Sequence, residues 1–199
     1  IKQTRMTEFS PWRTYRSRPT TAMKLKNDTD QIVSVFLTNE THNMDVLIAS
    51  HRAFGLRYPL EEVPVVGAKA AGVKAINLKE DDYVVAGALV PSEGDSPILL
   101  LSQRGAAKRM LAQELPQLGR AKRGLMIFRE LKKNPHRLAY MTTETEGTLA
   151  LTTKKGIETE IEIAEIAISD RMTNGTFVIN EKQDGELFSV QNIQKLVED

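Results

Sequence analysis

The sequence predicts an all-β fold of the propeller class. Three observations lead to it: a repeat of about fifty residues, apolar runs of strand length in each copy, and glycines at matching turn positions. Residues 50–57 align with residues 102–109 at an offset of 52, and a further shift of 51 gives a third copy. At the first offset, identical residues meet at four more positions: Glu62 with Glu114, Pro64 with Pro116, Gly67 with Gly119, and Gly72 with Gly124.

The copies divide the chain into an incomplete first repeat, residues 1–43, and three complete ones, residues 44–95, 96–146 and 147–199. We expect all four to form a single domain over residues 1–199. Because Ile1 aligns with Gly55, the first copy lacks its leading strand. The chain begins with Ile rather than Met, so we expect it to be an excised piece of a longer protein.

Each copy is expected to hold four strands. Apolar runs at 46–49, 98–101 and 149–151 predict buried leading strands, and each run ends at a polar turn with a basic residue. The alternation of apolar residues and glutamates over 157–163 predicts a half-buried second strand. Third strands are predicted after each loop glycine, as over Val73–Leu78. Fourth strands are predicted at Gln31–Leu37, Tyr83–Ala86, Arg137–Thr142 and Glu186–Val190, and a few helical residues near Gln191–Val197.

Composition excludes several classes of protein. The chain of 199 residues contains no cysteine, so it has no disulfide framework and no thiolate zinc site, which suits a cytoplasmic protein. No apolar run approaches the roughly 18–20 residues that span a bilayer, and no signal peptide stands at the start. Net charge is +1 overall. The four copies nevertheless carry +3, −3, +6 and −5 in chain order.

The charge segregation has two interpretations. Runs of Lys and Arg are commonly a solvated surface with no ligand. Here, however, basic residues recur at equivalent points: Arg52, Arg104 and Lys155 in one turn, and Lys69 and Arg120 in one loop. Equivalent loops of a repeat array lie on one side, and a basic rim favours phosphates because it releases condensed counterions. The sequence therefore favours binding of duplex DNA.

No catalytic or metal constellation is visible. The loops 67–72 and 119–124 resemble phosphate-binding loops but lack the following Lys-Ser/Thr, so we interpret them as turns. The three histidines show no metal spacing, and Tyr15 among arginines is interpreted as a packed aromatic rather than a nucleophile. Since Glu62, Glu114 and Glu165 are repeat-equivalent, we predict one recurring hydrogen bond or ion pair per blade.

The segments 49–64, 100–109 and 119–124 resemble the C-terminal repeats of the A subunits of bacterial type IIA topoisomerases, and the resemblance covers essentially the whole chain. It implies a β-pinwheel, a propeller variant of four-stranded blades that exchange strands and bend DNA around a basic perimeter. Two members of the family compete. The gyrase signature Gln-Arg-Arg-Gly-Gly-Lys-Gly is absent, and residues 9–19 look more like topoisomerase IV of Gram-positive bacteria, which we favour over gyrase.

The resemblance further implies that the whole enzyme passes one duplex through another, with ATP and Mg²⁺ bound on other domains or subunits and no cofactor or catalytic residue in this piece. The partners implied are duplex DNA, an ATPase B subunit and an upstream cleavage domain. A rival interpretation is a protein-interaction propeller without a DNA role. The predicted phosphate contacts are Arg104, Lys108, Arg109, Arg120, Lys122 and Arg123, followed by Arg13, Arg16, Arg18, Arg52 and Arg57.

Overall fold

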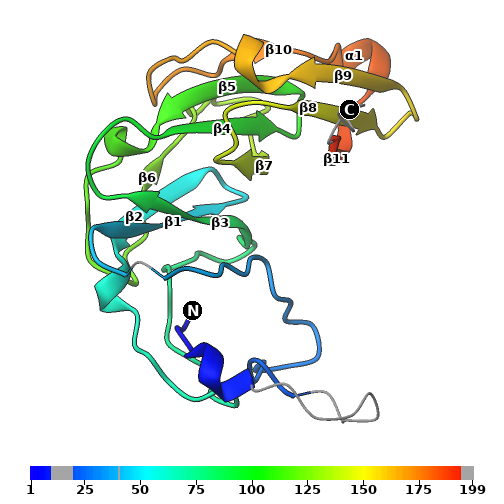
Figure 1. The fold of residues 1–199 in the computed structure, drawn as a ribbon. Helices are drawn as coiled ribbons and strands as arrows, with labels where there is room; N and C mark the ends of the chain where they lie inside the picture. The colour runs from blue at the N-terminus through cyan, green and yellow to red at the C-terminus, as the bar shows by residue number, and fades with distance from the viewer. Residues whose placement is uncertain (10–19, 40, 194–199) are drawn as a thin grey trace, which may run out of the picture.

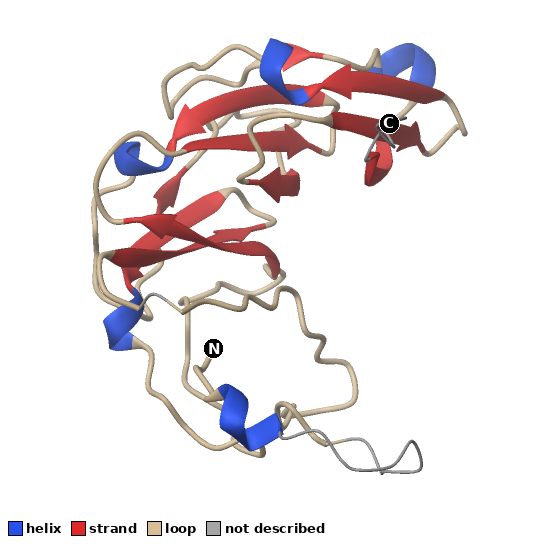
Figure 2. Cartoon of the chain, viewed as in Figure 1, coloured by secondary structure: helices blue, strands red, loops and turns tan. Residues whose placement is uncertain are grey.

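The computed structural model describes residues 1–9, 20–39 and 41–193, and these form an array of small antiparallel sheets (Figure 1). Figure 2 shows that short helices lie between the strands and that the N-terminal part is mainly loop. The strands are β1 Met44–Ser50, β2 Phe54–Pro59, β3 Val84–Pro91, β4 Pro97–Ser102, β5 Ala106–Leu111, β6 Leu125–Met126, β7 Leu138–Thr142, β8 Thr148–Thr153, β9 Glu158–Glu162, β10 Thr176–Phe177 and β11 Leu187–Ile193. The helices are η1 Met6–Phe9, η2 Leu60–Glu62, η3 Ala112–Glu114, η4 Ile163–Glu165 and α1 Glu181–Asp184.

The sheets exchange strands between repeats. The strand order is β3-β1-β2-β6 in the first sheet, β7-β4-β5-β10 in the second and β11-β8-β9 in the third. Thus β6, from the third copy, completes the sheet of the second copy, and β10, from the fourth copy, completes the sheet of the third. This donation of an outer strand to the sheet of the preceding copy confirms the predicted pinwheel arrangement of the blades.

The outer strands are shorter than predicted, because each pairs over only two residues. Val73–Leu78 forms no strand at all. Each outer segment instead begins at a glycine pressed against the preceding copy. Gly124 has φ +84°, and a Cβ there would lie 2.2 Å from the carbonyl oxygen of Gly55; Gly175 stands in the same relation to Ala107. Any other residue would clash with backbone at this joint, so glycine is required there.

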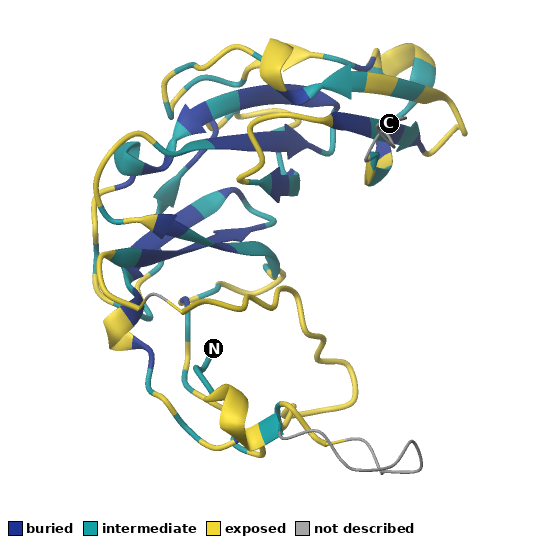
Figure 3. Ribbon diagram, viewed as in Figure 1, coloured by how far each residue is buried: buried dark blue, intermediate teal, exposed yellow. Residues whose placement is uncertain are grey.

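The fourth strands are confirmed in the complete copies as β3, β7 and β11, but the prediction for Gln31–Leu37 is wrong. That segment is extended loop, and Val35 and Leu37 are 82% and 76% exposed (Figure 3). The physical reason is pairing: β3, β7 and β11 each bond to a leading strand, and no described residues provide one for the first copy.

The predicted helix near the end of the chain is also wrong where it can be compared. Residues 191–193 lie in β11, and the rest of that prediction lies outside the described residues. A four-residue helix occurs instead at α1, where the Asn180 side chain accepts from the backbone N–H of Gln183 as an N-cap.

The core lies between consecutive sheets. Strands β1 and β4 are buried along almost their whole length, since both faces of each sheet pack against neighbours. Leu47, Leu100, Met110 and Phe128 meet in the central cluster, and Leu99, Leu101 and Leu149 in the next. Burial of each such side chain contributes about 1.5–3 kcal/mol. The strand β9 is less covered, so its glutamates at 158 and 160 are exposed.

Candidate nucleic-acid interface

The junctions between copies are built from a repeated glutamate contact. The Oε2 atom of Glu62 accepts the backbone N–H of Arg120 at 2.7 Å, and the Oε2 atom of Glu114 accepts the backbone N–H of Arg171 at 2.6 Å. In each case the carboxylate fixes the loop of the following copy. The prediction of one recurring hydrogen bond per blade is confirmed for these two junctions.

The arginine of each loop is also used inside the junction. Arg120 donates from Nη1 to the carbonyl of Lys74 at 2.6 Å and from Nε to the carbonyl of Glu62 at 3.2 Å. Arg171 repeats the first contact by donating to the carbonyl of Met126. Arg120, a predicted phosphate contact, therefore anchors its loop rather than standing free.

The loop carries two further cations, Lys122 and Arg123, beyond Ala121. Lys122 is exposed, while its carbonyl accepts from the N–H of Asn77 at 2.9 Å. The Arg123 guanidinium lies 3.8 Å from the centre of the Phe54 ring, which orients it at the outer edge of the first sheet. No hydrogen bond joins either of these side chains to the described residues. The loop backbone is thus fixed and its two cations are available to a ligand.

The hairpin turns place a second set of cations at the ends of the sheets. The turn at 50–54 is held by Asp82, which accepts the backbone N–H of Arg52, and the Arg52 side chain is half-buried. At the equivalent turn, Arg104 donates to Glu181 at 2.7 Å and to the carbonyl of Asn134 at 2.8 Å. Burial would raise the pKa of Glu181, but hydrogen bonds from Arg104 and Asn134 outweigh it and lower that pKa.

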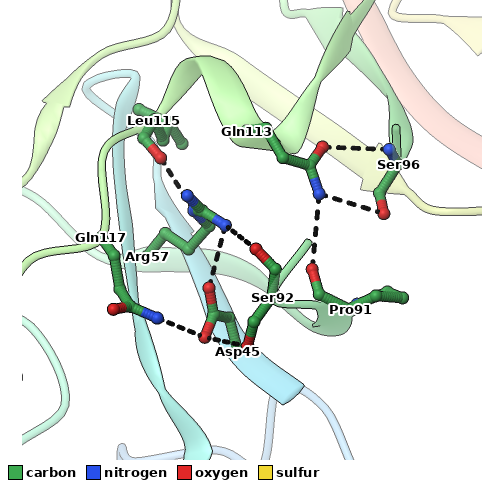
Figure 4. Close-up of polar contacts among 8 residues, drawn as sticks. All are labelled: Asp45, Arg57, Pro91, Ser92, Ser96, Gln113, Leu115 and Gln117. Atoms are coloured by element: carbon green, nitrogen blue, oxygen red, sulfur yellow. Dashed lines mark hydrogen bonds and ion pairs between the residues drawn. The ribbon is translucent and has the colours of Figure 1, made fainter. Parts of the chain in front are cut away.

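Arg57 does not reach the surface, which corrects its assignment as a phosphate contact. Its side chain is buried and donates to Asp45 at 2.9 Å, to the carbonyl of Leu115 at 2.7 Å and to the carbonyl of Ser92 at 3.1 Å (Figure 4). Asp45 is fully buried and also accepts from Ser92 and Gln117. Arg57 is therefore a structural arginine that joins the second copy to the third.

Lys108 requires the same correction. The residue is 1% exposed, and its Nζ donates to the carbonyls of Asp170, Arg171 and Thr173 at 3.2, 2.7 and 2.9 Å. Burial lowers its pKa to about 8, so the group remains an ammonium at neutral pH with one donor for each carbonyl. Lys108 holds the loop 170–175 from beneath.

Arg109 occupies the position of Arg57 in the next copy. Its Nε donates to the carbonyl of Ile166 at 2.6 Å and its Nη2 to that of Ala164 at 3.1 Å. The sequence did offer a signal for these buried cations: Arg57 and Lys108 interrupt otherwise apolar strands, in Leu56-Arg57-Tyr58 and Ala106-Ala107-Lys108. A charge in a strand covered on both faces indicates an internal partner.

Three exposed cations escaped the sequence-based assignment. Arg129, Lys132 and Lys133 lie in the loop between β6 and β7. The backbone N–H groups of Ile127 and Leu138, at the two ends of this loop, bond to the turn that holds Arg52. The sequence feature that could have indicated these three cations is the net charge of +6 on the third copy. The predicted contacts Arg13, Arg16 and Arg18 lie outside the described residues. No cluster of three His, Asp or Glu side chains suited to a metal, and no helix able to cross a membrane, occurs among the described residues.

Comparison with known proteins agrees with this architecture. The family model described as "DNA gyrase C-terminal domain, beta-propeller" matches residues 1–39, 45–91 and 96–142, more than half of the chain. The chain belongs to the gyrase A C-terminal domain family. Within that family it is 40% identical over its whole length to the A subunit of DNA topoisomerase 4 from Streptococcus pneumoniae, and 41% identical over 96% of its length to that from Bacillus subtilis.

Solved members of the gyrase A C-terminal domain family share the fold. The crystal structure of the C-terminal domain of DNA topoisomerase IV superposes with a TM-score of 0.82 at 38% identity, covering 97% of this chain and 58% of that one. A DNA gyrase A C-terminal domain superposes with a TM-score of 0.64 at 15% identity, which shows the fold alone. These identities confirm the preference for topoisomerase IV over gyrase. The chain spans about a quarter of the length of the curated A subunits.

Proposed function

We propose that this chain binds duplex DNA by its phosphate backbone, without reading sequence, at the loop 119–124 and the neighbouring turns. The observation that carries the proposal is the pair Lys122 and Arg123, which stand on a loop whose backbone is fixed from both sides while their side chains remain available. Stacking on Phe54 leaves the in-plane N–H donors of the Arg123 guanidinium free for phosphate oxygens.

The burial of Lys108 and Arg57 changes the expected set of contacts. Lys108 and Arg57 are excluded from this set because they are buried. Three further arginines, Arg104, Arg109 and Arg120, already donate to internal partners. The remaining surface consists of half-exposed and exposed cations. Its members are Arg52, Lys122, Arg123, Arg129, Lys132 and Lys133. About six phosphate contacts would give a slope of log K against log salt near −5. Bending 20–30 base pairs costs on the order of 1–6 kcal/mol, which contacts of this number can offset.

In the whole protein, we infer that this domain grips a DNA segment and presents it for ATP-dependent strand passage, with decatenation and relaxation as the outcome. The cleavage domain would precede it in the same chain, and a B subunit would bind ATP and Mg²⁺. The protein would act in the cytoplasm, at the nucleoid. The support for this role is the identity with topoisomerase 4 A subunits over the full length of the chain.

Fluorescence anisotropy with a labelled random duplex of 30 base pairs tests the proposal. We expect a salt slope near −5, and a slope reduced by about two in the double variant Lys122→Ala/Arg123→Ala. The matched control Lys154→Ala/Lys182→Ala removes two exposed lysines from the acidic last copy and should leave the slope unchanged. A slope near zero, or equal loss in both double variants, would favour the rival protein-interaction propeller.

A further inference from the structure

The loop 170–175, at the junction of the third and fourth copies, is closed across its middle. The backbone N–H of Thr173 donates to the carbonyl of Asp170 at 3.1 Å. The ammonium group of Lys108 lies beneath the loop and donates to the same carbonyl at 3.2 Å and to that of Thr173 at 2.9 Å. The loop therefore folds back over a lysine, and we call this conformation the closed form.

The loop 67–72, at the junction of the first and second copies, has the closed form too. The N–H of Ala70 donates to the carbonyl of Gly67 at 3.1 Å. Lys2, at the position of Lys108, donates to that carbonyl at 3.0 Å. Two of the three junctions are thus closed loops over a lysine.

The loop 119–124, at the junction between these two, differs at its centre. Ala121 has φ +63°, whereas the φ of its equivalent, Met172, is not positive. The N–H of Ala121 donates to the carbonyl of Ala75 at 3.0 Å, and the bond that closes the other two loops has no counterpart among the described residues of this one. Beneath the loop, the buried Leu56 stands in place of the lysine. We call this conformation the left-handed form.

The conformation of Ala121 decides where the side chains that follow it lie. A left-handed backbone is unfavourable for alanine because its Cβ comes close to the following carbonyl oxygen, so the contacts around the residue must hold it there. Those contacts are its bond to Ala75 and the bond from the N–H of Asn77 to the carbonyl of Lys122 at 2.9 Å. Because Lys122 and Arg123 come next in the chain, the φ of Ala121 sets the direction in which both leave the loop.

The two forms place equivalent side chains differently. In the closed form, Asn174 has the position of Arg123, and its side-chain Oδ1 atom is buried with no hydrogen-bond partner among the described residues. In the left-handed form, Arg123 reaches the Phe54 ring at the outer edge of the sheet. We propose that Ala121 is a positioning residue of the candidate DNA interface: its left-handed backbone keeps the loop from closing and so presents Lys122 and Arg123 to phosphates. This role rests on the proposed DNA binding and adds a determinant to it.

Fluorescence anisotropy with the same labelled random duplex tests this role. Ala121→Val puts a β-branched side chain in the left-handed region, which it tolerates poorly, so we expect the loop to close and the affinity for DNA to fall roughly tenfold. Ala121→Gly and Ala121→Asn accept a positive φ and should bind as the parent chain does. The matched control Met172→Val changes the equivalent residue, whose φ is not positive, and should leave the affinity unchanged.

A second background separates positioning from a general loss of structure. In Lys122→Ala/Arg123→Ala the loop has no cations to present, so Ala121→Val should cause no further loss of affinity. Amide hydrogen exchange at Ala121 and Asn77 should accelerate in Ala121→Val, while residues 170–175 stay unchanged. The role is overturned by a further loss in that background, by parent-like binding or exchange of Ala121→Val, or by a loss in Ala121→Asn, Ala121→Gly or Met172→Val. A salt slope near zero in the parent chain would instead overturn the proposed DNA binding, and with it this role.

Discussion

Two junctions share one backbone plan and differ in where they put positive charge. Between the second and third copies, the buried Leu56 lies under the loop 119–124. The side chain of Lys122 is exposed and that of Arg123 is half-buried. Between the third and fourth copies, Lys108 lies under the loop 170–175 with three carbonyls as partners. Both loops are pinned by the same glutamate contact. The repeat thus fixes the ends of the loop, and single substitutions decide whether its charge serves stability or a ligand.

The largest expected effect concerns the arginines of the two junctions. Arg57→Ala would leave the fully buried Asp45 without its cation, so we expect a loss of about 3–5 kcal/mol in the free energy of unfolding. Arg109→Ala removes only bonds to carbonyls, because Pro97 stands where Asp45 does, and should cost about 1–2 kcal/mol. Urea unfolding of both variants measures the difference. Equal losses would show that the buried ion pair adds nothing.

A smaller loss of stability is expected when the lysine beneath the loop 170–175 is replaced. Lys108→Leu introduces the residue found at the equivalent position 56. It removes the ammonium group that donates to three carbonyls, so we expect a destabilisation of about 2 kcal/mol. Hydrogen exchange should accelerate in residues 170–175 and stay unchanged in 119–124. Faster exchange in both loops would mean that the junctions are coupled rather than independent.

The smallest effect is a pH dependence at the hairpin turn of the third copy. Burial and, less strongly, the nearby Arg104 lower the pKa of His136, which is 3% exposed and bonded to Ser102. The unfolded chain then binds the proton more readily, so stability should fall as pH drops below about 6.5, by at most 1.4 kcal/mol per pH unit. His136→Gln should flatten this part of the curve in thermal unfolding between pH 5 and 7. An unchanged slope would exclude His136 as its source.

Much of the fold followed from the repeat, because an offset in sequence carries over directly into equivalent positions in space. It predicted the buried leading strands, the glutamate contact of Glu62 and Glu114, and the turn at Gly105, whose φ is +79°. Exposure of cations was harder to predict. Whether Lys108 or Lys122 points inward depends on sheet packing, and the local charge runs look alike. The prediction of a strand at Gln31–Leu37 was wrong because a strand also needs a pairing partner, which its own residues do not specify.

Because each outer strand comes from the following copy, the strand exchange also sets an order of events during synthesis. The hairpin ending at Pro59 acquires its outer strand only when Leu125 and Met126 have left the ribosome. At about 5–20 residues per second, that interval lasts roughly 3–13 s. During it the edge of β2 is open, and the same interval recurs for β5. Each blade of a nascent chain is therefore finished by a later one, and a stalled ribosome would leave its last hairpin with an unpaired edge.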